Sequence, residues 1–244
     1  MERALTPAEF RAVWERKPVL RAVYEEHYRL IAAWARPGRT VEIGAGAGNL
    51  KDSMPRVLSS DITPAEWLDI MLDAQALPFA TGSLANVIGV DVLHHIEYPR
   101  HLLTEAARVL EPGGRVVFVE PAITPVSWLV FKLGHPEPVD LGVDPLSDGL
   151  PNPSKHPFES NQAIPTLLAG RHRGRFEREF PQLQLVHHQR LSPFAYPLSG
   201  GYRPWCLLPE RLVQPVMRFE NRLAPALGPL MAFRLLMVIE KRHG

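Results

Sequence analysis

The sequence has a single cysteine, an almost balanced charge and no long uninterrupted hydrophobic run. Because Cys206 has no cysteine partner in the chain, an intramolecular disulfide is excluded, which is typical of proteins in reducing compartments. The formal net charge is +1, and the lysines and arginines form no basic run. A nucleic-acid substrate is therefore disfavoured, because binding to phosphates depends on concentrated positive charge.

Membrane-spanning and secretion signals are also lacking. The most apolar stretch, residues 223–239, is interrupted by two prolines and by Arg234, so we expect no transmembrane helix. Residues 1–11 are charged and lack the apolar core of a signal peptide, which favours a cytoplasmic protein. The amphipathic stretch 212–230 favours a helix docked on the core, and it is also compatible with peripheral attachment to a membrane or with a lipid-linked acceptor.

The most informative segment is Thr40–Leu50, which reads T-V-E-I-G-A-G-A-G-N-L. Its first four residues have the pattern of a short buried strand, and Glu42 places a carboxylate near the end of that strand. Glycines at alternate positions then allow the backbone to turn sharply and to approach a ligand closely. These glycines are Gly44, Gly46 and Gly48.

Three kinds of nucleotide loop compete for this segment. A phosphate-binding P-loop requires Gly-Lys-Ser/Thr, but Gly48 is followed by Asn49, Leu50 and Lys51. The dinucleotide fingerprint G-x-G-x-x-G requires a third glycine where this chain has Asn49, which weakens the case for NAD. What remains is an acidic residue followed by G-x-G-x-G.

Further motifs follow the next two apolar strands. The second strand, 56–60, leads to Asp61, whose carboxylate can accept hydrogen bonds from both hydroxyls of a ribose. Dinucleotide-binding proteins use the same chemistry, so Asp61 alone does not separate the alternatives. A third apolar run, 70–72, leads to D-A-Q-A-L-P-F at residues 73–79.

The fourth and fifth strands complete the pattern. The fourth strand, 85–90, ends in D-V-L-H-H-I at residues 91–96. A helix is expected at about 100–110, followed by an E-P-G-G turn and by a fifth strand at 115–119. The fifth strand is almost wholly apolar, as a parallel strand buried on both faces should be.

Together, the acidic residue before G-x-G-x-G, the D-A-x-x-L-P-F run, L-H-H-I and R-V-L-E-P-G-G-R resemble the class I S-adenosylmethionine-dependent methyltransferases. The small-molecule enzymes of this family, including those of quinone biosynthesis, are similar over about residues 37–121. The resemblance implies S-adenosylmethionine as the cofactor and S-adenosyl-L-homocysteine as the product. The residues that it implies for cofactor binding are Glu42, Gly44, Ala45, Gly46, Gly48, Asp61, Ile62, Asp73, Ala74, Asp91 and Val92.

The same resemblance implies an α/β fold, namely a Rossmann-like three-layer αβα sandwich. Its seven-stranded sheet would be mostly parallel, with an antiparallel last strand. We expect an N-terminal helical cap over residues 1–36 and a methyltransferase domain over 37–244. Within that domain, the cofactor-binding core would cover 37–121. Acceptor-side insertions would cover about 122–181 and, between strands six and seven, 192–231.

Two short segments depart from the family pattern. Only residues 49–55 separate the glycine loop from the second strand, so the first helix is expected to have little more than a turn or two. Thr63–Glu66 is a capping box with proline at the first helical position, and it is expected to begin only a brief helix. Before the core, a capping box at Thr6–Glu9 and an apolar repeat over 20–34 predict two helices, which either cover the cofactor or simply pack on the sheet.

The region after residue 121 is rich in proline, since fifteen of the 25 prolines lie between 121 and 215, and we expect it to be irregular. Helices are expected near 126–133, 161–169 and 209–223, and strands at 183–191 and 233–239. The aromatic stretch 193–205 is expected to border the acceptor site through Tyr196, Tyr202 and Trp205. Alternatively, it packs beneath the insertion's own helix.

Methyl transfer from a sulfonium is an in-line displacement, so the protein mainly has to position and desolvate the reactants. A general base is needed only when the acceptor arrives protonated. His94 and His95 are then the candidates, although histidines at this place can instead orient the loop or wall off the cofactor. Glu120, at the end of the fifth strand, is a weaker candidate.

No metal site is expected, because the polar residues of the following loop lack EF-hand or zinc spacing. These residues are His135, Glu137, Asp140, Asp144 and Asp148. The sequence thus predicts a methyltransferase with a small-molecule or lipid-linked acceptor. Two alternatives remain, an NAD-dependent oxidoreductase on a similar sheet and a non-catalytic partner protein with this fold.

Overall fold

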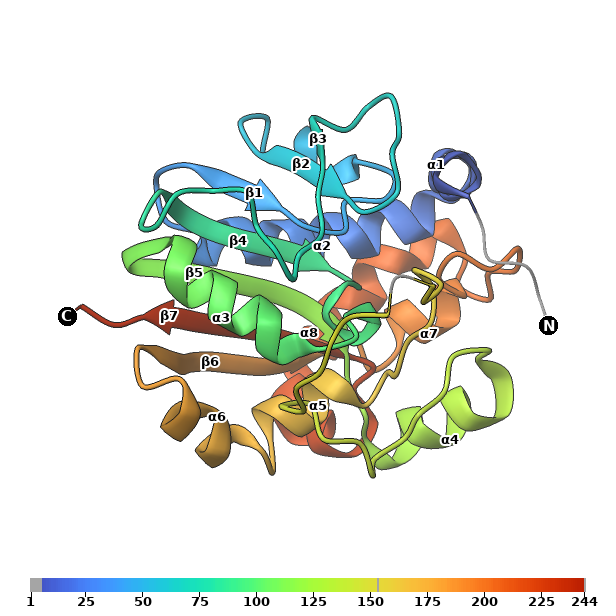
Figure 1. The fold of residues 1–244 in the computed structure, drawn as a ribbon. Helices are drawn as coiled ribbons and strands as arrows, with labels where there is room; N and C mark the ends of the chain where they lie inside the picture. The colour runs from blue at the N-terminus through green and yellow to red at the C-terminus, as the bar shows by residue number, and fades with distance from the viewer. Residues whose placement is uncertain (1–5, 153, 244) are drawn as a thin grey trace.

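A computed structural model describes residues 6–152 and 154–243, so the charged segment 1–11 lies partly outside the described residues. Its seven strands form one sheet in the order β3-β2-β1-β4-β5-β7-β6 (Figure 1). The strands are β1 (Thr40–Glu42), β2 (Leu58–Asp61), β3 (Ile70–Met71), β4 (Leu84–Val90), β5 (Leu110–Pro121), β6 (Leu183–Leu191) and β7 (Arg234–Lys241). Neighbours among β1 to β5 pair in parallel, and β7 is antiparallel to both β5 and β6. The predicted sheet, with its antiparallel last strand, is confirmed.

Helices cover both faces of this sheet (Figure 1). They are α1 (Pro7–Arg16), α2 (Pro18–Trp34), α3 (Pro99–Val109), α4 (Pro125–Gly134), α5 (Ile164–Ala169), α6 (Arg173–Glu179), α7 (Ala195–Ser199) and α8 (Glu210–Met231), with short 3-10 helices η1 (Asn49–Asp52) and η2 (Leu93–His95). One face buries α3, α5 and α6, and the other buries α2, while α8 lies against β6 and α2.

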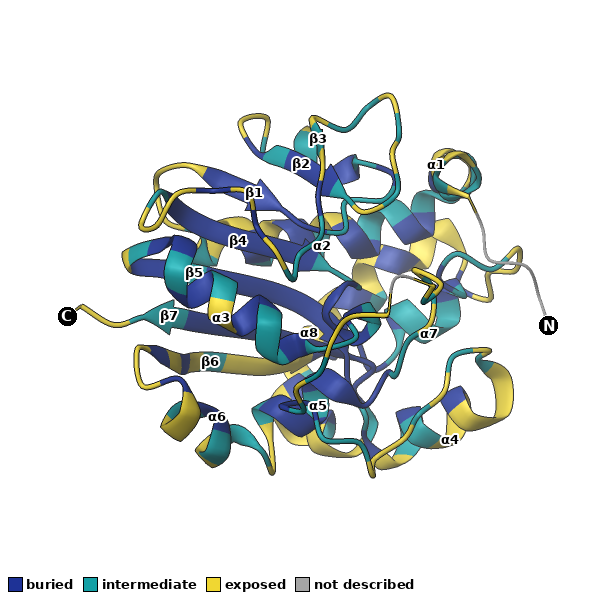
Figure 2. Cartoon of the chain, in the orientation of Figure 1, coloured by how far each residue is buried: buried dark blue, intermediate teal, exposed yellow. Residues whose placement is uncertain are grey.

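The alternation of side chains along β5 shows why its sequence is apolar throughout. Val116 and Phe118 pack with α3 on one face, whereas Val117 and Val119 pack with α2 on the other. Both faces are therefore buried, and no position in the strand's centre can be polar without a partner. Figure 2 shows the central strands as buried and the edge strand β6 with exposed residues.

Most elements lie close to their predicted positions. The short first helix appears as η1, and the strand at 183–191 has the predicted bounds. The helices α6 and α7 were not predicted; both are short and have no side-chain cap. Among the described residues, no helix is both long enough and apolar enough to cross a membrane.

The last helix is longer than predicted. α8 continues past Leu223 to Met231, although Pro225 and Pro229 lie inside it. Each proline removes a backbone donor and should weaken the helix. The helix nevertheless buries a stripe at helical spacing, formed by Val213, Met217, Glu220, Ala224 and Gly228. Burial of this stripe outweighs the local cost, as tertiary packing commonly outweighs propensity.

The brief helix expected from the capping box at Thr63–Glu66 is wrong. This segment forms turns between β2 and β3. The amide of Thr63 donates to the carboxylate of Asp61 at 2.8 Å, which holds the start of the segment in a turn. Asp69 then pairs with the backbone of Ser59, so the chain has returned to the sheet before a helix could develop.

An ion pair between a buried arginine and a partly exposed aspartate joins β7 to the loop after β4. Nη1 of Arg234, which is 1% exposed, lies 2.6 Å from Oδ1 of Asp91. Nη2 of Arg234 donates to the carbonyl of Val119, and the hydroxyl of Tyr24 donates to Asp91 at 2.7 Å. Burial opposes both charges, but their mutual attraction outweighs it, lowering the pKa of Asp91 and raising the pKa of Arg234. One charged pair thus connects α2, β4, β5 and β7.

Removing the carboxylate of Asp91 is expected to destabilise the fold strongly, because the guanidinium of Arg234 is 1% exposed and would stay buried without its charged partner. Asp91→Asn should lower the free energy of unfolding by about 3–5 kcal/mol. Arg234→Met should cost less, because the carboxylate that it leaves unpaired is 28% exposed. Glu240→Gln is the matched control, since it leaves Arg115 without its partner across the same two strands, β5 and β7, but Arg115 is 21% exposed whereas Arg234 is 1% exposed. That change should cost about 1 kcal/mol or less. Urea unfolding would contradict this account if all three variants lost the same small amount.

Candidate functional site

The predicted cofactor-binding residues and the two histidines lie at one edge of the sheet. β1, β4 and β5 run in parallel and end at this edge, and β7 begins there because it is antiparallel. In sheets of this kind, ligands bind outside the carboxyl ends of the strands. The edge therefore collects the loop after β1, the turn after β4, the end of β5 and Arg234.

The loop after β1 is tightly packed at both ends and open at its centre. Gly44, Gly46 and Gly48 have φ angles of 64°, 49° and 73°, in the left-handed region that favours glycine. A Cβ at Gly44 would collide with Val92, and a Cβ at Gly48 would collide with Trp67. A Cβ at Gly46 would meet nothing within 4 Å. The loop thus leaves space beside Gly46 for a ligand.

Acidic side chains stand at the ends of β1 and β2. Asp61 accepts hydrogen bonds from the amides of Gly46 at 2.9 Å and Thr63 at 2.8 Å. Glu42 is 4% exposed, and its Oε2 has no hydrogen-bond partner. Burial, assisted by the negative charge of Asp61, raises the pKa of Glu42 to about 8. At neutral pH, Glu42 is therefore mostly protonated.

Trp67 and Ala45 hold the loop in place. The indole Nε1 of Trp67 donates to the carbonyl of Gly46 at 2.9 Å, and the guanidinium of Arg11 lies 4.8 Å above the indole ring. The amide of Ala45 donates to the carbonyl of Ser60 in β2 at 2.8 Å. Trp67 was not predicted as a site residue, because it lies in the turn where the sequence indicated a helix.

Three further predicted cofactor residues follow β2 and β3. Ile62 follows Asp61 and is 51% exposed, so its apolar side chain is open to contact. Asp73 and Ala74 lie after β3, where the carboxylate of Asp73 accepts from the amide of Gln75 at 2.8 Å and Ala74 packs against the core.

Asp91 differs from the other predicted residues, because its carboxylate is held by Arg234 and Tyr24. Its φ of 56° is unusual for a residue other than glycine, and such strain persists only when the surroundings enforce it. The ion pair supplies that enforcement. Asp91 thereby fixes the start of the turn that carries the two histidines.

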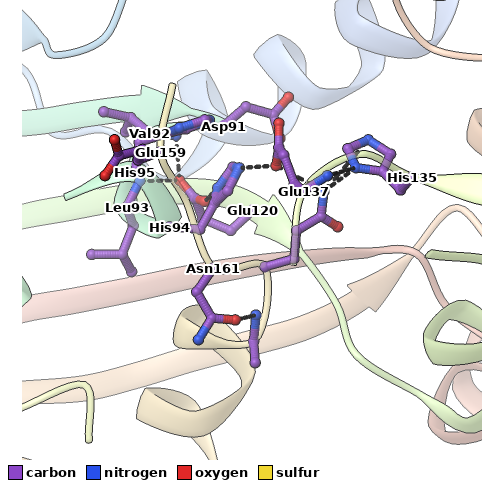
Figure 3. A network of polar contacts seen from close by, with 12 residues as sticks. Asp91, Val92, Leu93, His94, His95, Glu120, His135, Glu137, Glu159 and Asn161 are labelled. Atoms are coloured by element: carbon purple, nitrogen blue, oxygen red, sulfur yellow. Dashed lines mark hydrogen bonds and ion pairs between the residues drawn. The ribbon is translucent and has the colours of Figure 1, made fainter. Parts of the chain in front are cut away.

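Glu120 and His94 form the centre of a buried polar network (Figure 3). Oε1 of Glu120 accepts from the amides of Val92 at 2.9 Å and Leu93 at 2.8 Å, while Oε2 lies 2.7 Å from Nδ1 of His94. Nε2 of His94 lies 3.4 Å from Oε2 of Glu137. Burial opposes the charge on His94, but the two carboxylates outweigh it and raise its pKa to about 10. Both nitrogens of His94 thus face a carboxylate.

His95 is different from its neighbour. Its ring centroid lies 4.2 Å from that of His94, yet its Nδ1 is buried and has no hydrogen-bond partner. Burial, followed by the charge of His94, lowers the pKa of His95 to about 3, so this imidazole is neutral. Of the two candidate bases, only His95 has a buried nitrogen without a partner.

Two of the five polar residues after α4 lie together. Glu137 belongs to the histidine network, and Nε2 of Gln162 lies 2.9 Å from its Oε2 and 3.0 Å from Nδ1 of His135 (Figure 3). The other three lie elsewhere: Asp140 accepts from the amide of Gly142, Asp144 pairs with Arg175, and Asp148 contacts His101. The contact of Glu137 with His94 bridges distant parts of the chain, so sequence spacing gave no sign of it.

Two of the three predicted acceptor residues lie at this edge. The ring of Tyr196 is 4.7 Å from the guanidinium of Arg234, and the ring of Tyr202 is 5.7 Å from that of Tyr24. Trp205 is 43% exposed and packs on Gly200 rather than on this group.

Two phenylalanines that the sequence did not single out extend the aromatic group. Phe10 of α1 lies 4.8 Å from Tyr202 and 6.0 Å from Phe158, measured between ring centroids. Phe158 in turn meets the ring of His95 edge-on at 6.2 Å. The N-terminal cap, the loop before α5 and the aromatic stretch therefore meet next to the histidines.

Lys17, between α1 and α2, fixes the aromatic stretch. Its Nζ lies 2.6–2.9 Å from four backbone carbonyls, those of Gly201, Ser199, Arg203 and Trp205. An ammonium has three hydrogens, so one of them is shared. This contact connects the N-terminal helices to a loop far away in the sequence.

A pocket of about 230 Å³ lies next to Glu137 of the histidine network. It is lined by Trp128, Phe131, Lys132 and residues 135–139.

The decisive comparison concerns the core of the chain. Residues 41–118, from β1 into β5, match the methyltransferase domain family. This part of the chain is therefore similar to a methyltransferase domain. The matched segment is less than half of the chain and contains the glycine loop, Asp61, Asp73 and the histidine pair. None of the curated proteins matches the sequence.

Solved structures share the fold of this chain. Geranyl diphosphate C-methyltransferase from Streptomyces coelicolor A3(2) has a TM-score of 0.54 and 14% identity, covering 91% of this chain and 80% of that one. A SAM-dependent methyltransferase from Archaeoglobus fulgidus has a TM-score of 0.52 and 15% identity, covering 91% and 94%. The [4+2]-cyclase SpnF has a TM-score of 0.53 and 14% identity, covering 90% and 81%. At these identities the likeness shows the fold, and the cyclase is named for a different reaction.

The raised pKa of Glu42 predicts a specific pH dependence of stability. The carboxyl group of Glu42 has its ordinary pKa of 4.5 in the unfolded chain and a pKa of about 8 in the folded chain. Between these two pH values the folded chain keeps a proton that the unfolded chain has lost. The contribution of this proton to the free energy of unfolding is therefore fully present below pH 4.5 and is lost as the pH rises through about 8. Glu42→Gln keeps a neutral side chain and should remove this loss, which is of the order of several kcal/mol at about 1.36 kcal/mol per pKa unit. Urea unfolding at several pH values measures it.

Asp52→Asn serves as the control for that series, because Asp52 is an exposed carboxylate in η1. The free energy of unfolding of Asp52→Asn should change with pH in the same way as that of the wild type. If the free energy of unfolding of Glu42→Gln also changes with pH as in the wild type, the buried carboxyl group is not the source of the pH dependence.

Proposed function

We propose that the protein is an S-adenosylmethionine-dependent methyltransferase that acts on a small-molecule or lipid-linked acceptor. The observation that carries this proposal is the geometry of the loop after β1 within a methyltransferase domain. The loop leaves free space at Gly46, and the end of β1 carries a buried oxygen of Glu42 without a partner. Both features suit a ligand that approaches the backbone closely and brings a positively charged donor.

In this proposal, the acidic residues recognise different parts of the cofactor. S-adenosylmethionine supplies a methyl group that is activated by the sulfonium charge. Glu42 would accept from the ammonium of the methionine part, and Asp61 would accept from the ribose hydroxyls. Asp73 with Ala74 would bind the edge of the adenine, and the exposed Ile62 would pack on its face.

The other predicted residues would shape the site. Val92 supports Gly44 by direct contact, and Asp91 holds the turn before the histidines through its pair with Arg234. Both are positioning roles. They keep the loop rigid, so that little ordering is needed when a ligand binds.

The acceptor side would use the aromatic residues and His95. Phe10, Phe158 and Tyr202 would exclude water from the reacting groups, which strengthens electrostatic interactions there. His94 is engaged by two carboxylates, so we assign the contact with a protonated acceptor to Nδ1 of His95.

The surface of α4 supports an acceptor with an apolar part. Trp128 and Phe131 of this helix line the pocket of about 230 Å³ beside Glu137. The same helix exposes Leu129, Val130 and Leu133, and Leu133 is 79% exposed. An apolar chain leaving the pocket would find a continuous apolar path along α4, which fits a lipid-linked acceptor and peripheral contact with a membrane.

A pair of glycine variants tests the cofactor loop. Gly46→Ala should weaken the binding of S-adenosylhomocysteine by at least about tenfold, or 1.4 kcal/mol, because the Cβ occupies the space for the ligand. Gly82→Ala is the matched control, since Gly82 has a φ of 66°, also has no atom within 4 Å of the added Cβ, and lies before β4 at the opposite edge. Both changes should cost a similar stability, about 1–2 kcal/mol. Equal affinities in isothermal titration calorimetry would refute the assignment of this loop.

Cofactor binding should also release a proton from Glu42. At pH 7 this group is mostly protonated, and an ammonium placed beside it would favour the carboxylate. Calorimetric titrations with S-adenosylhomocysteine in buffers of different ionisation enthalpy should therefore show the release of most of one proton. Glu42→Gln should release almost none. The same dependence on buffer in both proteins would show that Glu42 does not meet the ligand's charge.

A further inference from the structure

His94, His95 and Glu137 form a cluster with the composition of a metal site. One ligand atom of each residue lies within 4.8 Å of the ligand atoms of the other two. The two histidines come from η2, and Glu137 comes from the loop after α4 (Figure 3). The fold, rather than any local sequence motif, therefore assembles this set.

We propose that these three side chains bind one divalent first-row transition-metal ion of the Zn²⁺ type. Two imidazoles and one carboxylate are the donor set of catalytic zinc sites and of non-haem iron sites. Mg²⁺ and Ca²⁺ are disfavoured, because they prefer oxygen ligands throughout. The proposed function does not require this ion, so the two proposals stand or fall separately.

Two of the three ligands are already oriented by neighbouring groups. Glu120 holds Nδ1 of His94 at 2.7 Å, which leaves Nε2 facing Glu137 at 3.4 Å. Gln162 donates to Oε2 of Glu137 at 2.9 Å. Metal-binding histidines commonly have a carboxylate on the second ring nitrogen, which fixes the ring and increases its basicity.

The third ligand provides an independent indication of a missing partner. Nδ1 of His95 is buried and makes no hydrogen bond, which is a costly state for a polar atom. A metal ion would satisfy this nitrogen. At Nε2 of His94 the ion would take the place of the proton that faces Glu137, and its charge would lie close to the carboxylates of Glu120 and Glu137.

The position of the cluster suggests what the ion would do. Three protein ligands leave one coordination position open, as in catalytic zinc sites. Glu137 also lines the pocket of about 230 Å³, so a ligand in that pocket can reach the ion. An acceptor hydroxyl bound to the ion would have a lower pKa and would lose its proton to solvent more readily, and His95 would then act as a ligand rather than as the base. This last step alone rests on the proposed methyl transfer.

Metal binding to the full chain tests the proposal directly. After dialysis against a chelator, the protein is titrated with Zn²⁺ by calorimetry and with Co²⁺ by visible absorption. We expect one ion per chain and the visible bands of four- or five-coordinate Co²⁺, with no comparable binding of Mg²⁺. The absence of saturable Zn²⁺ binding, or six-coordinate Co²⁺ bound as weakly as Mg²⁺, would overturn the proposal.

Variants identify the ligands. His95→Ala and Glu137→Gln should weaken Zn²⁺ binding by more than about 100-fold, and Glu120→Gln should weaken it by about 10–100-fold, as expected for an outer partner. His188→Ala, which removes an exposed histidine of β6, should leave the affinity unchanged. Unchanged affinity in His95→Ala and Glu137→Gln, or an equal loss in His188→Ala, would contradict the assignment. If a variant fails to fold by circular dichroism, the wild-type stoichiometry and the Co²⁺ spectrum still decide.

The same chelator-treated samples separate this proposal from the proposed function. S-adenosylhomocysteine should bind the metal-free wild type and Glu137→Gln with similar affinity, because Glu137 lies outside the glycine loop. A wild-type protein that binds S-adenosylhomocysteine but shows no saturable Zn²⁺ binding would reject the metal site alone. Metal binding without any affinity for S-adenosylhomocysteine would reject the methyltransferase function alone.

Discussion

The ion pair between the buried Arg234 and Asp91 is the constraint on which the rest of the site depends. β7 is antiparallel, so its first residue meets the ends of β4 and β5, and Arg234 can reach Asp91 at 2.6 Å. The pair compensates for the left-handed backbone of Asp91 and fixes the turn that follows. That turn places Val92 against Gly44, and it positions the amides of Val92 and Leu93 to donate hydrogen bonds to Glu120. The shape of the glycine loop and the position of the histidines therefore follow from one charge pair.

Much of the fold could be predicted because its signals are local. Apolar runs bounded by glycine and proline indicate buried parallel strands, and the few residues between Gly48 and β2 leave room only for η1. The errors arose where distant groups decide the outcome. Asp61 takes the amide of Thr63 and turns the chain where a capping box indicated a helix. α8 continues through its prolines because the sheet and α2 bury one of its sides.

The candidate site also has parts that the sequence predicts and parts that it does not. The glycine loop and the acidic residues at the strand ends belong to short motifs, so their neighbourhood could be predicted. The contact of Glu137 with His94, and the four carbonyls around Lys17, join segments that are far apart in the sequence, and no spacing rule predicts them. The sequence does contain an indication of the role of Arg234. A charged residue at the start of an apolar strand needs a partner of opposite charge. From the sequence alone, we interpret Arg234 only as an interruption of a hydrophobic run.

The central claim is that the loop after β1 binds the nucleoside and amino-acid parts of S-adenosylmethionine rather than a dinucleotide. The most direct measurement is a pair of calorimetric titrations of the purified wild-type protein, one with S-adenosylhomocysteine and one with NAD. The account predicts saturable binding of S-adenosylhomocysteine at one site per chain and no binding of NAD. Binding of NAD without binding of S-adenosylhomocysteine would contradict it.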